Sequence, residues 1–184
     1  MAAITATTGC RNDVAATCQG GVVTDLYERL IADLDAAGAS YRLIDHEPEG
    51  RTPVVSAMRG HELAHAAKCI VVMVKVGKKQ SHYVLAVVPG DARVDLNAVK
   101  ALYDGTHVSF AATDRAEELA GSVSGTVLPF TYDERLALVI DPRVLEPDEL
   151  FFNAAGLDRS MALNTKDYQR IANPRIEPIA APAG

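Results

Sequence analysis

The sequence predicts an α+β fold: one compact domain with a mixed, strongly curved, barrel-like sheet surrounded by helices. Two runs rich in β-branched residues, 69–76 and 83–88, are bounded by Gly77 and by Pro89 and Gly90, which is typical of antiparallel strands joined by a short polar turn. Both runs are almost continuously apolar, so we expect the sheet to be covered on both faces. Helical and strand patterns follow one another without strict alternation, which favours α+β over α/β.

The composition is that of a globular protein. The chain has 184 residues, of which 48% are hydrophobic and 23% charged, enough for one domain with a sizeable core. No apolar run reaches membrane-spanning length, and the first residues lack the basic start and apolar stretch of a secretory signal, so we expect a cytoplasmic protein. Three cysteines without a Cys-x-x-Cys pair argue against a disulfide framework or a thiolate zinc site.

Charge is distributed unevenly along the chain. The net charge of −6 argues against a protein that wraps a nucleic acid. Residues 42–79 nevertheless carry seven basic and four acidic side chains. These charges either solvate the predicted hairpin or form one basic face that holds the end of an anionic ligand.

The N-terminal part of the chain predicts an arm, two helices and a strand. Residues 1–20 are rich in Ala and Thr without periodicity, and we expect a loose arm. Thr24 is the predicted N-cap of an amphipathic helix that Gly38 ends. A short strand over residues 41–46 leads to a polar loop, and Thr52 caps a short helix that ends before Gly60.

The C-terminal part predicts a mixture of short elements. The predicted domain covers residues 21–179, and residues 180–184 form a tail. The sequence beyond Asn173 is rich in proline and should be extended. Predicted helices cover residues 96–103 (capped by Asp95), 114–120 (capped by Thr113) and 165–172, and predicted strands cover residues 107–111, 136–141, 150–154 and 161–164.

Lys68 is the leading candidate for a catalytic group. It stands where the apolar run of the first hairpin strand begins. A lysine at the edge of a buried strand keeps a compact charge in a partly desolvated place, which suits stabilisation of a negative oxygen on a substrate. The alternative is that its side chain simply extends to water from the end of the strand.

The segment His61-Glu62-Leu63-Ala64-His65 matches the zinc-peptidase signature His-Glu-x-x-His. That chemistry needs both histidines one turn apart on a helix that extends beyond the motif. Gly60 precedes the motif directly and a strand is predicted from Cys69, so any helix is short. A metallopeptidase is therefore a remote alternative, and we expect surface side chains and no metal site.

Two further groups of residues could line a site. Gly121 and Gly125, followed by Pro129, predict a loop whose backbone can approach a ligand closely and offer N–H groups to an oxyanion. Asp141 and Asn153 stand at or near the ends of predicted strands, where polar groups commonly point into a site; Asp141, which precedes a proline, could instead make a turn.

Taken together, these residues resemble the YbaK and prolyl-tRNA-synthetase-associated editing domains. The resemblance covers residues 23–179 and rests on a succession of loose motifs. In order along the chain, these are His46-Glu-Pro-Glu-Gly-Arg-Thr52, Lys68 at the start of a strand, Val-Val-Pro-Gly-Asp-Ala-Arg-Val-Asp at residues 87–95, Gly125-x-x-x-Pro129, the strand that ends at Asp141, and Asn153-Ala-Ala-Gly156.

The resemblance implies a free-standing enzyme that hydrolyses the ester of a tRNA mischarged with a small amino acid, without metal, cofactor or covalent intermediate. Its partner would be the 3′ end of the tRNA, and the resemblance leaves open an aminoacyl-tRNA synthetase as a second partner. A non-catalytic module that binds a tRNA end or a synthetase remains the alternative. Lys68 would be catalytic, and the substrate-binding residues would be His46, Thr52, Gly125, Thr126, Val127, Leu128, Pro129, Asp141 and Asn153.

Overall fold

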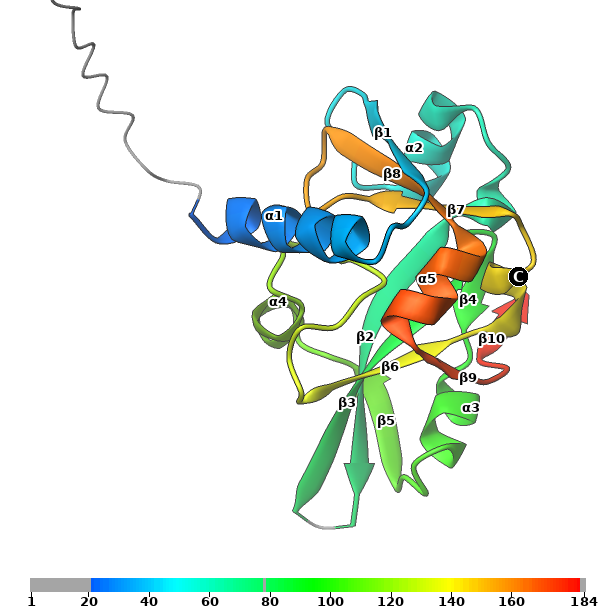
Figure 1. The fold of residues 1–184 in the computed structure, drawn as a ribbon. Helices are drawn as coiled ribbons and strands as arrows, with labels where there is room; N and C mark the ends of the chain where they lie inside the picture. Colours follow the sequence, from blue (N-terminus) through cyan, green and yellow to red (C-terminus); the bar gives the residue numbers. More distant parts are fainter. Residues whose placement is uncertain (1–20, 78, 183–184) are drawn as a thin grey trace, which may run out of the picture.

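The computed structural model describes residues 21–77 and 79–182, in which helices and strands are mixed along the chain (Figure 1). The expected N-terminal arm, residues 1–20, lies outside the described residues. The helices are α1 (Gly21–Ala36), α2 (Thr52–Arg59), α3 (Leu96–Ala101), α4 (Thr113–Ala120) and α5 (Thr165–Ala172). The strands are β1 (Tyr41–Asp45), β2 (Ala67–Val76), β3 (Gln80–Pro89), β4 (Ala92–Val94), β5 (His107–Phe110), β6 (Leu136–Ile140), β7 (Glu149–Asn153), β8 (Arg159–Asn164), β9 (Arg175–Ile176) and β10 (Ala180–Pro182).

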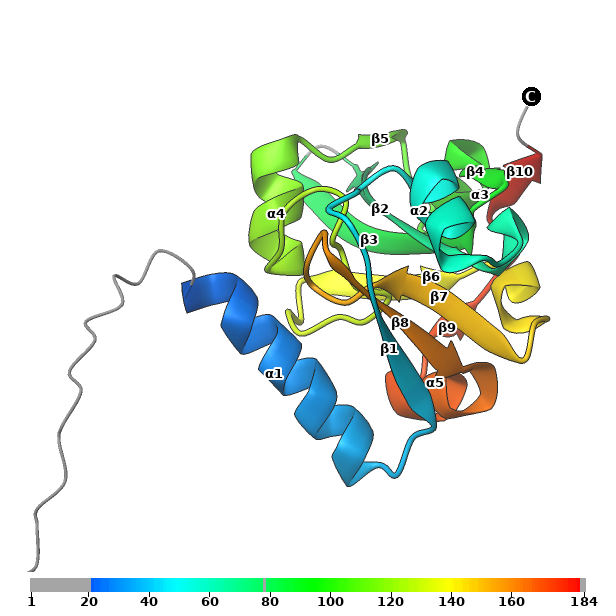
Figure 2. The same ribbon diagram turned by 90° about the horizontal axis from the view of Figure 1, so that it is seen from above.

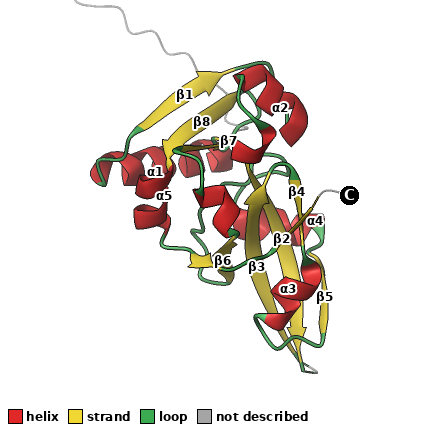
Figure 3. Ribbon diagram, turned by 90° about the vertical axis from the view of Figure 1, so that its right-hand side faces the viewer, coloured by secondary structure: helices red, strands yellow, loops and turns green. Residues whose placement is uncertain are grey.

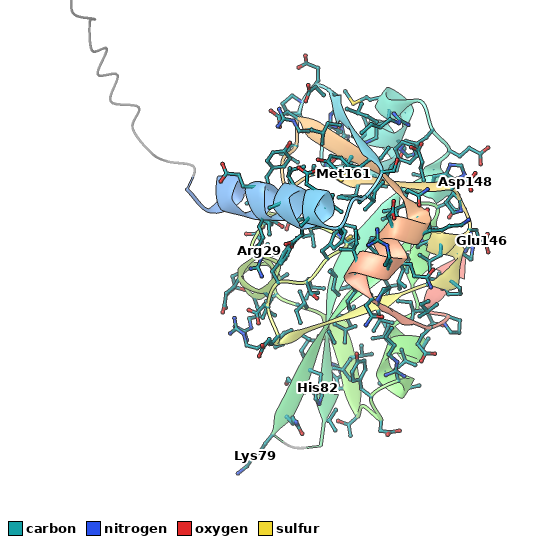
Figure 4. All side chains as sticks on the ribbon, viewed as in Figure 1. Arg29, Lys79, His82, Glu146, Asp148 and Met161 are labelled. Atoms are coloured by element: carbon teal, nitrogen blue, oxygen red, sulfur yellow. The ribbon has the colours of Figure 1, made fainter. Side chains whose placement is uncertain are left out.

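The predicted hairpin is the centre of the fold. β2 and β3 pair antiparallel over their whole length, from Ala67 opposite Pro89 to Val76 opposite Gln80. They lie in the middle of a five-stranded sheet of order β5-β2-β3-β6-β9, in which β3 pairs parallel to β6. The sheet is therefore mixed, as expected. Lys79 projects from the tip of the hairpin, and His82 lies further along β3 (Figure 4).

Both faces of this sheet are buried, which explains the continuous apolar runs. Alternate residues of β3 belong to two separate clusters: Leu85 and Val87 to one, Val84 and Ala86 to the other. The first cluster is closed by α1, α4, α5 and the sheet β1-β8-β7, and the second by α3 and the C-terminal segment around Ile179. The hairpin therefore lies between two outer layers (Figures 2 and 3).

The strongly curved, barrel-like sheet is not seen. The described strands divide into three sheets, β5-β2-β3-β6-β9, β1-β8-β7 and β10-β4, and they do not close into a barrel. Among the described residues, no helix is both long and apolar enough to cross a membrane.

Several predicted boundaries differ from the structure. The N-cap of α4 is Ala112 rather than Thr113, and it makes no side-chain capping bond. α1 begins at Gly21, so Thr24 lies inside the helix and is not its N-cap. The N-cap of α2 is Arg51 rather than Thr52, and it makes no side-chain capping bond. Residues Ala180–Pro182, expected in a tail, pair antiparallel with β4. The Asp95 cap is confirmed, because its carboxylate accepts from the N–H groups of Asn97 and Ala98.

Candidate functional site

A cavity of about 390 Å³ opens where the start of β2 meets α2, β7 and the loop that contains Gly125. Arg51, Arg59 and Lys68 line it, and no Asp or Glu among the described residues does. We call this space the cationic cavity. The five predicted site residues that line it are Thr52, Lys68, Gly125, Val127 and Asn153.

The ammonium group of Lys68 is held by backbone carbonyls. Its Nζ donates to the carbonyl oxygens of Gly90 (3.3 Å) and Ala92, in the turn between β3 and β4. Partial burial lowers the pKa of Lys68 below its usual 10.5, although the Asp91 carboxylate opposes this effect. An ammonium has three N–H donors, so these two contacts leave one for a ligand in the cavity. The side chain is positioned rather than merely solvated.

Arg59 and Asn153 form the polar wall of the cavity. Arg59 Nη2 donates to Asn153 Oδ1, and Arg59 Nε donates to Ser160 Oγ at 2.7 Å. Burial lowers the pKa of the Arg59 guanidinium to about 10, so it keeps its charge at neutral pH. Asn153 Nδ2 donates to the carbonyl oxygens of Glu49 (3.0 Å) and Gly125 (2.8 Å). One buried amide thus ties together α2, the segment before it and the glycine loop.

His46 does not line the cavity but supports this wall from behind. Its Nδ1 lies 2.8 Å from the Glu47 carbonyl oxygen and must carry a proton to bond with it. In the neutral ring, Nε2 therefore accepts from the Ser160 hydroxyl, at 2.5 Å. Ser160 in turn accepts from Arg59. The expected role of His46 in binding substrate becomes an indirect one.

Gly125 is required by the close approach of two loops. Its φ is +92°, and a Cβ there would lie 3.0 Å from the Cα of Gly50. A side chain would therefore meet both backbone strain and a backbone neighbour that cannot rotate away. The glycine lets this loop pack against the segment that precedes α2 and form the edge of the cavity.

The rest of the predicted loop is mostly structural. The Thr126 hydroxyl donates to the Val123 carbonyl at 2.8 Å, and its N–H bonds to the same oxygen at 3.0 Å. Leu128 is buried in the main core cluster. The Pro129 carbonyl accepts a hydrogen bond from the buried Tyr168 hydroxyl at 2.8 Å. Of residues 125–129, only Gly125 and Val127 line the cationic cavity.

The structure does not bring Asp141 into the site. Its buried carboxylate accepts from the N–H groups of Arg143 (3.1 Å), Ile179 (2.9 Å) and Ala180 (2.8 Å). It therefore caps the 3₁₀ turn Pro142–Leu145 and anchors the C-terminal segment. Of the two possibilities open from the sequence, the turn is the one the structure shows.

The His-Glu-x-x-His segment does not form a helix that could present two zinc ligands. α2 ends at Arg59, Leu63–His65 is one 3₁₀ turn, and β2 begins at Ala67. The His61 ring stacks on Phe151 with centroids 3.9 Å apart. In the part of the chain that the structure describes, no three His, Cys, Asp or Glu side chains gather to hold a metal ion. This geometry gives no support to a metallopeptidase.

These histidines instead border a separate hollow of about 580 Å³ beside Phe151. Four acidic residues line it: Glu62, Glu146, Asp148 and Glu149. Glu146 and Asp148 are labelled in Figure 4. The negative charge of this hollow makes it unsuited to bind phosphate, in contrast to the cationic cavity.

Sequence reasoning missed Arg59, Ser160 and Gly50. Arg59 sits in the last turn of α2, directly before the glycine that ends it, and looks like an ordinary C-terminal helix charge. Ser160 comes from β8, more than a hundred residues away in the chain. Only the pairing of β8 with β7, which sets Ser160 opposite Asn153, brings Ser160 into the polar wall.

Comparisons with known proteins agree with this architecture. The model of the aminoacyl-tRNA editing domain matches residues 46–171. The multifunctional Ser/Thr-tRNA deacylase ProXp-y of Escherichia coli K12 is 40% identical over 151 residues, which are 82% of this chain and 90% of that protein. The prolyl-tRNA editing protein ProX of Acetoanaerobium sticklandii is 27% identical over 106 residues, 58% of this chain and 63% of that protein.

A crystal structure of a candidate trans-editing enzyme for prolyl-tRNA synthetase has the same fold, with a TM-score of 0.69 and 18% identity over 89% of this chain and 99% of that one. The family model spans α2, the hairpin, the glycine loop and β7, which line the cationic cavity, and also His46 and β8, which support its polar wall. The chain belongs to the aminoacyl-tRNA editing domain family.

Proposed function

We propose that the protein is a free-standing trans-editing deacylase that hydrolyses the ester joining a small, wrongly attached amino acid to the 3′ end of a tRNA. The observation that carries this proposal is the cationic cavity itself. In a protein of net charge −6, Arg51, Arg59 and Lys68 line one space that no described Asp or Glu lines, and of these three cations Arg51 is paired with Glu49 at 2.8 Å. Such a space attracts a terminal phosphate and stabilises a developing negative oxygen.

Hydrolysis of the ester requires little from the protein beyond positioning the reactants and stabilising the developing charge. Water attacks the ester carbonyl carbon and gives up a proton, and the carbonyl oxygen becomes negative. The bond from the carbonyl carbon to the ribose oxygen then breaks, and that oxygen takes up a proton. We assign stabilisation of the oxyanion to the third N–H of Lys68, because the carbonyls of Gly90 and Ala92 accept from the other two.

The glycine loop supplies one wall of the cavity beside the ester. Gly125 and Val127 face the cavity, and Asn153 holds the Gly125 carbonyl in place. A binding pocket separates two amino acids that differ by one methylene by only about 1–3 kcal/mol. A second, size-limited site that hydrolyses the wrongly attached amino acid is therefore a sound physical way to correct a synthetase error. The similarity to a Ser/Thr-tRNA deacylase makes seryl and threonyl esters the first to test.

A synthetase partner would add tRNA affinity that the chain itself has little charge to supply. Nonspecific binding to RNA grows with the number of phosphates neutralised, and this protein is acidic. We propose that the tRNA 3′ end binds here while a synthetase presents it. Addition of the partner synthetase should then lower KM more than it raises kcat.

The test is a deacylation panel with alanyl-, seryl-, threonyl- and cysteinyl-tRNA. We expect the wild type to hydrolyse at least one of them and Lys68→Ala to lose at least about a hundredfold in kcat/KM, the range seen when one oxyanion donor is removed. Lys75→Ala is the matched control, because Lys75 is exposed on the same strand and lies outside the cavity. A wild type that binds tRNA without hydrolysing any ester would instead favour the binding module.

A further inference from the structure

A second, uncharged hollow adjoins the cationic cavity. It has a volume of about 360 Å³, and Ile70, Val71, Phe110, Ala116 and Val127 form much of its lining. The hydroxyl-bearing residues Thr113 and Ser124 complete it, and no charged residue of the described chain lines it. We call it the apolar hollow.

The two spaces share part of their lining. Cys69, Ile70, Gly125 and Val127 line both of them. Cys69 is not a reactive group at this junction, because burial raises the pKa of its thiol far above the usual range. A ligand whose reacting end is in the cationic cavity would therefore have the apolar hollow next to it.

Phe110 is the outstanding feature of this hollow. It is 59% exposed, the highest value among the exposed large hydrophobic residues of the described chain. It lies on the edge strand β5, opposite Val72 of β2, and the next residue, Ala111, donates its N–H to Val71 at 3.0 Å. Single exposed apolar residues are common. This one lies on a paired strand beside an apolar space that adjoins the candidate active site.

We propose that the apolar hollow is the site of the terminal adenine of the substrate tRNA, which stacks on Phe110. This inference rests on the proposed function. The ester and the adenine are attached to the same ribose, so a substrate with its ester in the cationic cavity must place the base in an adjoining space. An uncharged flat heterocycle suits an apolar hollow with one open aromatic face.

The hydroxyls of the hollow suit the edge of a purine. Ser124 Oγ donates to Glu117 Oε1 at 3.0 Å, so its lone pairs are the part left to accept from an exocyclic amino group. Thr113 is exposed at the start of α4 and can donate to a ring nitrogen. A serine or threonine side chain is small and polar, and it would gain little from an aromatic platform.

The test uses an acceptor-stem RNA hairpin whose 3′-terminal base is 2-aminopurine, which loses fluorescence when it stacks. We expect the wild type to quench the probe, Phe110→Ala to leave it bright, and Phe110→Trp to restore quenching. In deacylation, Phe110→Ala should raise KM about tenfold, within the range for loss of one base–aromatic stack, with kcat little changed. Leu43→Ala is the matched control, because Leu43 is a 42% exposed residue on another edge strand.

Three results would overturn the inference. Quenching by Phe110→Ala equal to that of the wild type would remove the stacking. An unchanged KM in active Phe110→Ala would show that the hollow does not bind the substrate. A changed preference between seryl and threonyl esters in Phe110→Ala would assign the hollow to the amino-acid side chain. The fluorescence assay needs no turnover, so an absence of deacylation would refute the proposed function and still leave the adenine site open to measurement.

Discussion

The side-chain amide of Asn153 donates a hydrogen bond to the carbonyl oxygen of Gly125 at 2.8 Å, and both residues line the cationic cavity. The same amide group donates to Glu49, and its oxygen accepts from Arg59. Because buried polar networks are rigid only when every member is satisfied, this amide fixes the shape of the cavity.

Asn153→Ala should therefore damage both stability and activity. The change leaves two carbonyls and part of a buried guanidinium without a partner, at a cost of about 1–3 kcal/mol in the free energy of unfolding. We expect kcat/KM to fall even at temperatures where the variant is folded. Urea unfolding and the deacylation assay measure the two effects separately.

Asn153→Asp and Asn97→Ala are the controls for that experiment. Aspartate keeps an acceptor for Arg59 but cannot donate to the carbonyls of Gly125 and Glu49, so it should fold better than Asn153→Ala and remain impaired in activity. Asn97 is exposed on α3, and its replacement should change neither quantity. Full activity in Asn153→Asp would contradict the role of the amide in holding the glycine loop.

Activity should fall at alkaline pH as Lys68 loses its proton. Burial lowers the pKa of this ammonium below 10.5, so its charged form is lost earlier than in a free lysine. We expect kcat/KM, corrected for spontaneous ester hydrolysis, to decline through that pKa. Lys68→Arg should be less active but show no such decline, because a guanidinium keeps its proton. An identical alkaline decline in both proteins would assign it to another group.

The same group should make stability rise with pH. Between the lowered pKa of folded Lys68 and the unfolded value of 10.5, the unfolded chain binds more protons than the folded one. The contribution of Lys68 to the free energy of unfolding therefore increases with pH across this window, and below it the desolvation penalty is fully present. Urea titrations should show the stability of the wild type rising relative to that of Lys68→Met across the window.

The hairpin and most helix ends could be predicted from local signals. Gly77, Pro89 and Gly90 bound the two central strands, and Gly60 and Gly121 adopt positive φ where they end α2 and α4. These features depend on a few neighbouring residues. The start of α1 was wrong because Thr24 resembles a cap, although the helix continues back to Gly21.

The division into three sheets and the polar wall could not be predicted in the same way. Ser160 contacts Arg59 only because β8 pairs with β7. Asp141 lies outside the site because its carboxylate binds the C-terminal segment, which folds back onto it. Such contacts join residues about 40 to 100 positions apart, where periodicity carries no information. The motif order nevertheless located Lys68, Gly125 and Asn153 at one cavity.

A pair of glycine variants should separate backbone strain from steric clash. Gly121 and Gly125 both have positive φ, at +67° and +92°. A Cβ at Gly121 meets no atom within 4 Å, whereas one at Gly125 meets the Gly50 backbone at 3.0 Å. Gly121→Ala should cost about 1 kcal/mol in the free energy of unfolding, from strain alone.

Gly125→Ala should cost more than Gly121→Ala and should also reduce deacylation, because the loop must move away from Gly50 and distort the cavity. Thermal unfolding and kcat/KM measured on both variants make the comparison. Equal losses of stability, with activity intact in both, would show that the contact between Gly125 and Gly50 does not shape the site.

Asp141→Ala should reduce stability and spare catalysis. The buried carboxylate accepts from three backbone N–H groups, two of them in the segment that carries Ile179 and Ala180. Removing hydrogen bonds to a charged acceptor should lower the free energy of unfolding by at least about 2 kcal/mol and loosen the pairing of β10 with β4.

At a temperature where the variant is folded, kcat and KM should stay within about twofold of the wild type, because no atom of Asp141 lines the cationic cavity. Asp114→Ala, at an exposed aspartate on α4, is the control for losing one surface charge. A raised KM in folded Asp141→Ala would return this carboxylate to the substrate site, because a purely structural anchor changes the fraction of folded enzyme and not its affinity.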